Sequence, residues 1–212
     1  MDKKELELIL SSIPRYDRPK RMLEQYETPP SILAHILWEA LLRGDVENRT
    51  VLDLGCGALR FSIGSLILGA RTVIGVDIDE EIVSFGLSYS SKEYENLMPR
   101  LLVIIGDVRD IELGSIDTVL MNPPFGVYRQ NRGLDMLFLA KAFHIGAESV
   151  YSLHKYSHGV HNIVKQLTNS FGYKIIHAEI LDFPIPMIFE THVRKVYRVK
   201  VVFYIFKKNR ER

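Results

Sequence analysis

The chain has 212 residues, of which 47% are hydrophobic and 25% charged, the composition of a folded globular domain. Its 27 basic and 26 acidic residues leave a formal charge of +1, so the overall charge indicates no partner. A single cysteine, Cys56, excludes an intrachain disulfide and a multi-cysteine zinc site. We find neither an apolar run of about 18 residues nor a signal-peptide core, and therefore expect a cytoplasmic enzyme or binding domain without a metal.

Basic charge is concentrated at the C-terminal end of the chain. Residues 194–212 contain eight basic side chains and one acid, Glu211, which gives a local charge of +7 against −6 for the rest. A basic strip of this kind releases counterions when it contacts a phosphate backbone, which indicates nucleic-acid binding. A solvated edge strand explains the same pattern equally well.

The predicted elements follow in chain order. A helix lies within the first thirty residues, and after a proline-rich stretch Ser31 caps a second helix that runs to Gly44. Apolar strands are predicted over 50–54, 72–76, 101–105, 116–121 and 149–153, and helices over 61–68, 80–90, 134–143 and 161–171. Two long strands, 173–181 and 193–206, end the chain on either side of a loop around Pro184 and Pro186.

Apolar strands that alternate with helices indicate a doubly wound α/β fold. We expect a Rossmann-like, mostly parallel sheet of seven strands with an antiparallel C-terminal strand, in a domain of residues 31–212 that follows a helical extension of residues 1–30. In the usual strand order, 101–105 lies at the sheet edge. Its five apolar residues predict that a partner protein adds a strand there, unless loops of the same chain cover it.

The turn after the first strand is the first part of a predicted cofactor site. Gly55 and Gly57 let the backbone approach a ligand closely, whereas Arg60 stands where a dinucleotide-binding motif needs its third glycine. Asp53, directly before the turn, suits a ligand with a positive amino group, such as the methionine part of S-adenosylmethionine.

Acidic residues end the next two strands as well. Asp77 can accept both hydroxyls of a ribose, and Asp107 can accept a hydrogen bond from an adenine amino group. Asp79 is expected to cap the helix that follows. Together with Asp53, these acids predict a nucleoside pocket, but NAD would use Asp77 equally, so they do not select the cofactor.

The fourth strand ends in Asn122-Pro123-Pro124-Phe125, in which two prolines hold the backbone rigid. The Asn122 side-chain oxygen and the Pro123 carbonyl are predicted to accept the N–H groups of a planar amine. Such contacts favour a pyramidal, nucleophilic nitrogen and stabilise the positive charge that develops during methyl transfer. Phe125 offers a ring on which a base can stack. The alternatives are a simple proline loop and, for Phe125, a place in the core.

These motifs, in this order, resemble those of class I S-adenosylmethionine-dependent amino-methyltransferases, and more closely those of the methyltransferase-like five group. The resemblance rests on segments 23–28, 53–57, 121–126, 135–139 and 150–155. It implies N6 methylation of an adenine in small-subunit rRNA and a small zinc-binding activator at strand 101–105. Leu59 departs from the pattern, because many class I methyltransferases have a third glycine there. The cofactor residues expected from the residues and the resemblance together are Gln25, Thr28, Asp53, Gly55, Cys56, Gly57, Ala58, Arg60, Asp77, Ile78, Asp107, Val108 and Asn122.

RNA contacts are predicted for polar residues around the catalytic turn and in the basic tail: Arg129, Arg132, Lys155, Arg194, Lys195 and Arg198, with Tyr128, Asn131 and His154 as further candidates. An exposed polar loop and a structural histidine are the alternatives. Guanine-N2 and protein glutamine-amide methylation suit the same Asn-Pro-Pro turn. A cofactor-binding scaffold without activity and a nicotinamide-dependent oxidoreductase complete the alternatives.

Overall fold

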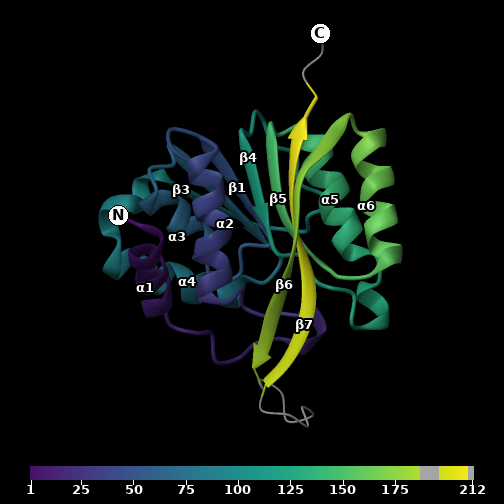
Figure 1. Cartoon of the computed structure of the whole chain (residues 1–212). Helices are drawn as coiled ribbons and strands as arrows, with labels where there is room; N and C mark the ends of the chain where they lie inside the picture. The colour runs from purple at the N-terminus through teal and green to yellow at the C-terminus, as the bar shows by residue number, and fades with distance from the viewer. Residues whose placement is uncertain (187–195, 210–212) are drawn as a thin grey trace.

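The computed structural model describes residues 1–186 and 196–209. Its centre is one seven-stranded sheet with the order β3-β2-β1-β4-β5-β7-β6, in which only β7 runs antiparallel to its neighbours (Figure 1). The strands are β1 (Thr50–Leu54), β2 (Thr72–Asp77), β3 (Leu101–Ile105), β4 (Thr118–Met121), β5 (Ser149–Lys155), β6 (Tyr173–Pro186) and β7 (Val196–Lys208). The predicted sheet is confirmed.

Six α-helices cover the two faces of the sheet in two layers. One face carries α1 (Lys3–Ser12), α2 (Pro30–Leu42), α3 (Arg60–Ile67) and α4 (Glu80–Glu93), and the other carries α5 (Leu134–Ile145) and α6 (His158–Ser170). Alternation along β4 serves both layers: Leu120 packs into the first, and Val119 and Met121 into the second. Among the described helices, none has the length and apolar character needed to cross a membrane.

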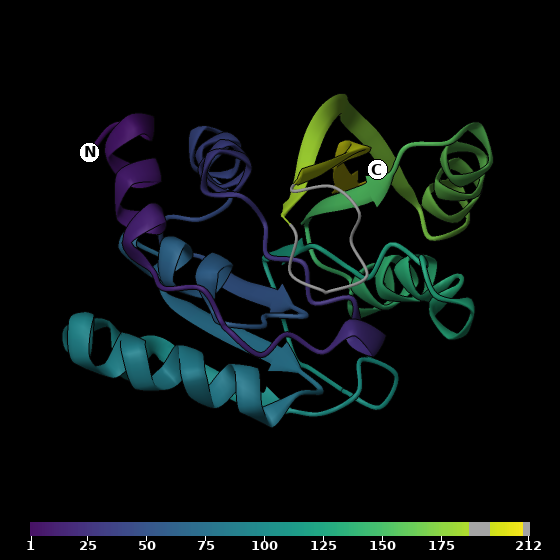
Figure 2. The ribbon, with the colours of Figure 1, turned by 90° about the horizontal axis from the view of Figure 1, so that it is seen from below.

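The N-terminal segment covers the carboxyl ends of the parallel strands on one side. Leu6 and Leu10 of α1 are fully buried and belong to the same core cluster as α2 and α3. The chain then passes across the carboxyl ends of the parallel strands, where Figure 2 shows it as the purple coil that follows α1. It forms the short 3-10 helix η1 (Arg21–Leu23) before α2. The Arg60 guanidinium anchors this crossing by donating to the carbonyls of Ile13 (2.8 Å) and Pro14 (3.1 Å).

Two local predictions are wrong, and proline explains both. Ser31 does not cap α2, because the helix begins one residue earlier at Pro30, where a missing N–H costs nothing and the fixed φ already suits a helix. The predicted loop around Pro184 and Pro186 is part of β6, which pairs with β7 as far as Pro186. Since β6 is an edge strand, it has one side on which a residue without an N–H is tolerated.

The sheet leaves β3 at its opposite edge, as the strand order predicted. Leu102 is 56% exposed and Ile105 46% exposed, so two large apolar side chains of this strand face solvent. An uncovered edge strand with such side chains is a place where another chain can add a strand.

Candidate active site

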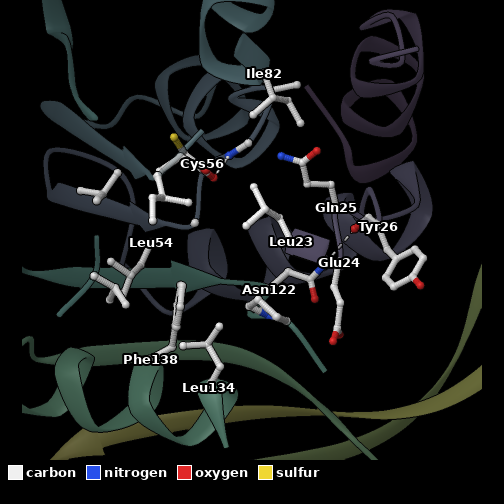
Figure 3. A pocket seen from close by; sticks show the side chains of 18 of the residues that line it. Leu23, Glu24, Gln25, Tyr26, Leu54, Cys56, Ile82, Asn122, Leu134 and Phe138 are labelled. Carbon is white, nitrogen blue, oxygen red and sulfur yellow. Dashed lines mark hydrogen bonds between the residues drawn. The ribbon is translucent and has the colours of Figure 1, made fainter. Parts of the chain in front are cut away.

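A cavity of about 360 Å³ opens at the carboxyl ends of β1, β2, β3 and β4, a size within the usual range for small-molecule sites (Figure 3). The N-terminal segment forms one wall, and α5 with the loop before it forms another. Every cofactor residue expected from the sequence lines this cavity except Asp53: Gln25, Thr28, Gly55, Cys56, Gly57, Ala58, Arg60, Asp77, Ile78, Asp107, Val108 and Asn122.

The glycine turn after β1 is closed by its own hydrogen bonds. Gly55 and Gly57 have φ angles of +81° and +49°, and a Cβ on Gly55 would lie 3.2 Å from the Phe138 ring. The amides of Gly55 and Cys56 both donate to the Val76 carbonyl, and that of Gly57 donates to Asp77 Oδ2 (2.8 Å). A turn whose amides already have acceptors is poorly suited to cradle a pyrophosphate, which disfavours a dinucleotide.

Asp77 ends β2 with its carboxylate in the cavity wall. Its oxygens accept the amides of Gly57 and Asp79 (2.9 Å), which fixes the side chain. Burial raises the pKa of Asp77, although these amide hydrogen bonds act in the opposite direction. Each carboxylate oxygen has a second lone pair, so the group can still accept ligand hydroxyls.

Asp79 caps α4 by accepting the Glu81 amide at 3.1 Å, as predicted. Its second task was not foreseen, because it also receives Lys20 Nζ (2.7 Å) and Gln25 Nε2 (2.6 Å) from the N-terminal segment. Burial works against the charged form, but the hydrogen bonds from Lys20 and Gln25 hold the pKa of Asp79 below its usual value. The cap of α4 thereby ties the segment across the cavity.

Asp107 enters the cavity as half of an ion pair. Arg109 donates to it from its backbone amide and from its guanidinium, and this lowers the pKa of Asp107. Both carboxylate oxygens therefore have a donor, and the adenine contact predicted for Asp107 would share an oxygen with Arg109.

Asp53 lies beneath the cavity rather than in its wall, which corrects the contact expected between this carboxylate and a ligand amino group. It is 1% exposed, and its Oδ2 accepts the backbone amide (2.9 Å) and the hydroxyl (2.6 Å) of Ser62 in α3. Its Oδ1 has no partner. Burial raises its pKa to about 7. The geometry makes Asp53 a brace between β1 and the first turn of α3.

Asn122 presents an unsatisfied acceptor to the cavity. Its Nδ2 donates to Thr28 Oγ1 (3.0 Å) and to the Tyr26 carbonyl (3.4 Å), the latter drawn as a dashed line in Figure 3. Its Oδ1 is buried and has no hydrogen-bond partner among residues 1–186 and 196–209. Because the amide nitrogen is held by the N-terminal segment, the oxygen is left for a donor from outside the chain.

Of the three residues that follow Asn122, one lines the cavity with it. Pro124 lines the cavity, but Pro123 is buried and Phe125 is only 7% exposed. The Phe125 ring packs edge-on against Phe183 of β6, with ring centroids 5.6 Å apart. In this structure the ring belongs to the core, which was the alternative for Phe125, and its stacking on a base stays a prediction.

The loop after the Asn122–Phe125 turn is held to the N-terminal segment by hydrogen bonds. Tyr128 receives a hydrogen bond from Arg21 Nε, and its backbone amide donates to Glu24. Asn131 is buried and donates to Glu24 Oε1 (3.0 Å) and to the Met22 carbonyl (3.0 Å). Asn131 thus has a structural task, whereas Arg129 of the short 3-10 helix η3 (Arg129–Asn131) and Arg132 after it are exposed.

The other predicted RNA contacts divide in the same way. Lys155 and Arg198 are exposed, and Arg194 and Lys195 lie outside the described residues. His154 is fully buried and contacts Ser152 Oγ at 2.8 Å and Asp135 Oδ2 at 3.4 Å. His154 is therefore a structural histidine, which was the alternative to an RNA contact.

Several cavity residues were absent from the sequence predictions, notably Glu24, Glu27, Leu134 and Phe138. Each lies within or next to a segment that carried the family resemblance, which was the available signal. What the sequence lacked was the direction of each side chain.

Comparisons with known proteins agree with this geometry. The sequence profile of the ribosomal protein L11 methyltransferase (PrmA) matches residues 35–122. The rRNA N(6)-adenosine-methyltransferase METTL5 of Danio rerio is 35% identical, over 97% of this chain and 99% of its own. A crystal structure from Pyrococcus horikoshii, provisionally assigned as an RNA methyltransferase, aligns with a TM-score of 0.88 at 36% identity over 98% of each chain. A Synechocystis magnesium protoporphyrin IX methyltransferase with bound SAM shares the fold, with a TM-score of 0.63 at 17% identity over 84% of this chain and 78% of its own.

Proposed function

Because this chain belongs to the METTL5 family of rRNA N6-adenosine-methyltransferases, we propose that it transfers the methyl group of S-adenosylmethionine to the N6 amine of an adenine in small-subunit rRNA. The observation that carries the proposal is the buried, unpartnered Oδ1 of Asn122 in the wall of a cofactor-sized cavity. An acceptor without a donor is costly inside a protein, so a ligand donor is expected to complete it.

The cavity residues fit the cofactor. Asp77 stands where it can accept the ribose hydroxyls, and Gly55 leaves room that a Cβ would fill against Phe138. Gln25 and Thr28 close the opposite wall, where hydrogen bonds to Asp79 and Asn122 orient them. When bound, S-adenosylmethionine supplies an electrophilic methyl group carried on a sulfonium.

Asn122 and the Pro123 carbonyl would act on the methyl acceptor. The lone pair of adenine N6 is delocalised into the ring, which makes the amine a poor nucleophile. Acceptors aimed at its two N–H groups favour a pyramidal nitrogen and stabilise the positive charge that develops on it. The bonds from Asn122 Nδ2 to Thr28 and Tyr26 hold its oxygen in place before the substrate arrives.

The test is methylation of RNA with a labelled methyl donor. We expect unmodified small-subunit rRNA transcripts to gain label, and digestion to nucleosides followed by mass spectrometry to yield N6-methyladenosine. N2-methylguanosine, or label confined to glutamine of a protein, would overturn the proposed substrate and favour the related amine or amide. Asn122→Ala should abolish transfer while calorimetry with S-adenosylhomocysteine still shows binding. Equal transfer by the variant would refute the role of Asn122, and absence of transfer by the wild-type chain would favour a scaffold.

We assign RNA contact to the exposed Arg129, Arg132, Lys155 and Arg198, which lie on elements at the carboxyl ends of β4 and β5 and on the long β6–β7 pair. Arg194 and Lys195 stay part of this proposal. Positive side chains around an adenine pocket would grip the flanking phosphates while the base enters it.

A small zinc-binding activator is proposed as the partner at β3, and the exposed apolar side chains of Leu102 and Ile105 support this partner. The chain is also expected to work in the cytoplasm. Replacing Val103 or Ile104 by Lys should abolish capture of the activator in a pull-down while methyl-donor binding persists. Undiminished capture would place the partner elsewhere, and cell fractionation would test the location.

A further inference from the structure

Within the part of the chain that the structure describes, two buried acceptor atoms of residues in the cavity wall lack a hydrogen-bond partner: Asn122 Oδ1 and Glu24 Oε2. The first has a place in the proposed reaction, and the second does not. Glu24 is only 5% exposed, so its carboxylate is almost fully removed from water. A buried carboxylate oxygen without a donor is more costly than a buried amide oxygen, because the group carries a charge.

The other oxygen of Glu24 holds the loop that follows the catalytic turn. Glu24 Oε1 accepts the backbone amide of Tyr128 (3.1 Å) and Asn131 Nδ2 (3.0 Å). Among the described residues, no basic side chain forms an ion pair with this carboxylate. Two neutral donors on one oxygen fix the orientation of the group but leave its charge uncompensated and its second oxygen open.

The backbone at Glu24 is strained as well. Its φ of 50° and ψ of 43° lie in the left-handed region, which side chains other than glycine rarely adopt. Strain of this kind persists where the surrounding structure requires one particular side-chain placement, and it is common at functional sites. Here it turns the Glu24 side chain away from that of its neighbour Gln25.

Figure 3 shows the result of this turn. Gln25 points towards Ile82, at the end of the cavity that holds the glycine turn, whereas Glu24 runs the opposite way, past Asn122. The hydrogen bond from Asn122 Nδ2 to the Tyr26 carbonyl keeps the two segments together. Glu24 and Asn122, each with one unpartnered oxygen among the described residues, therefore line the part of the cavity that lies away from Ile82.

We propose that Glu24 is a further catalytic residue: Asn122 Oδ1 accepts one N–H of the methyl-accepting amine, and Glu24 Oε2 shares the other with the Pro123 carbonyl and takes the proton that this amine loses. The inference rests on the proposed N6 methylation. The N6 lone pair forms the new N–C bond, and the electron pair of the breaking S–C bond stays on sulfur. N6 then bears a positive charge and two protons. One proton passes to Glu24, which leaves neutral N6-methyladenine and a neutral carboxylic acid that returns its proton to water when the product departs.

The chemistry explains why a carboxylate stands beside the amide. Asn122 and the Pro123 carbonyl are neutral acceptors that orient the amine but are too weakly basic to hold its proton. A carboxylate adds a full negative charge next to the nitrogen on which positive charge develops, and this favours the transition state over the bound substrate. A site that offers only acceptors also selects adenine, which has an amino group at this ring position, over guanine, which has a carbonyl there.

The experiment is a single-turnover assay with enzyme in excess over an unmodified small-subunit rRNA transcript and labelled S-adenosylmethionine. Glu24→Gln keeps the shape of the side chain and an oxygen for Tyr128 and Asn131, but it cannot take a proton. We expect its rate of methyl transfer to fall by about 100-fold, the lower range for loss of a general base, while the affinities for S-adenosylhomocysteine and for the transcript are retained. Formate should restore part of the rate of Glu24→Ala by filling the vacated space with a carboxylate.

Asn131→Ala is the matched control, because it removes a loop hydrogen bond to Glu24 and leaves the carboxylate. A Glu24→Gln rate within about threefold of wild type, far below the contribution of a proton acceptor, would overturn the proposal. An equal loss in Asn131→Ala, together with no formate rescue, would assign Glu24 to the loop alone and also overturn it. Both results require an active wild-type chain, so they are distinct from failure of the proposed function, in which the wild-type chain itself forms no N6-methyladenosine.

Discussion

Asp53 makes the stability of this protein depend on pH in a direction opposite to that of most carboxylates. Its pKa is raised from an ordinary value of 3.8 to about 7 by burial, so the folded protein keeps a proton that the unfolded chain has already lost. Stability is therefore lost as the pH rises from about 4 to about 7, and above pH 7 the buried charge opposes folding in full.

The magnitude follows from the two pKa values. With about 1.36 kcal/mol per pKa unit, the raised pKa of Asp53 lowers the stability of the fold, relative to its value at low pH, by about 2 kcal/mol at pH 5 and about 4 kcal/mol at pH 8. Asp53→Asn stays neutral and keeps an oxygen for Ser62. The difference in free energy of unfolding between variant and wild type should therefore shift by about 2 to 3 kcal/mol in favour of the variant between these pH values.

Urea denaturation at pH 5, 6, 7 and 8 measures this shift, with the fluorescence of Trp38, the single tryptophan, as the probe. Asp17→Asn is the control, because the Asp17 side chain is 83% exposed and its removal should give a difference that does not vary with pH. The reasoning is refuted if the Asp53→Asn difference is also constant from pH 5 to pH 8.

Three further predictions concern the turn, the N-terminal segment and the RNA surface. Leu59→Gly should destabilise the protein by about 2 kcal/mol in urea denaturation, since loss of a fully buried side chain outweighs relief of its φ of +65°; a stabilised variant would contradict this. Arg60→Met should lower the free energy of unfolding by about 3 kcal/mol and expose the N-terminal segment to limited proteolysis, because the carbonyls of Ile13 and Pro14 and the carboxylate of Glu27 lose a buried cation. Unaltered proteolysis would contradict this. Arg129→Glu with Arg132→Glu should weaken RNA binding and lower the salt slope by about 0.7 per lost phosphate contact, measured by filter binding at several KCl concentrations; an unchanged slope would remove both residues from the interface.

Much of the fold was predictable because strand periodicity and strand ends are local properties of the sequence. The runs that became β1 and β5 are mostly apolar and almost fully buried, as strands covered on both faces must be, and Asp77 and Asp107 mark where β2 and β3 stop. The extension of β6 through Pro184 was not predictable, because the penalty for proline depends on whether the strand has a free edge.

The sequence predicted which residues form the site better than it predicted where their side chains point. The sequence correctly placed Asp77 and Asn122 at the ends of β2 and β4, the two strands that flank β1, and both residues line the cavity. It could not show that Asp53 points beneath the turn or that Phe125 packs on Phe183, because these depend on tertiary contacts with Ser62 and with β6. Glu24 escaped notice for the same reason, since its left-handed backbone is set by its surroundings.

The contact between Phe125 and Phe183 has a mechanical consequence. The β6–β7 pair continues for five paired residues beyond the last residue that pairs with β5, an overhang of about 17 Å at the usual rise per residue. Phe183 is the second residue of β6 in this overhang, and its ring packs edge-on against the ring of Phe125. The overhang that carries Arg198 therefore packs, through Phe183, against the Asn122–Phe125 turn, so the strand pair proposed to contact RNA and the turn proposed to hold the methyl acceptor share one packed contact.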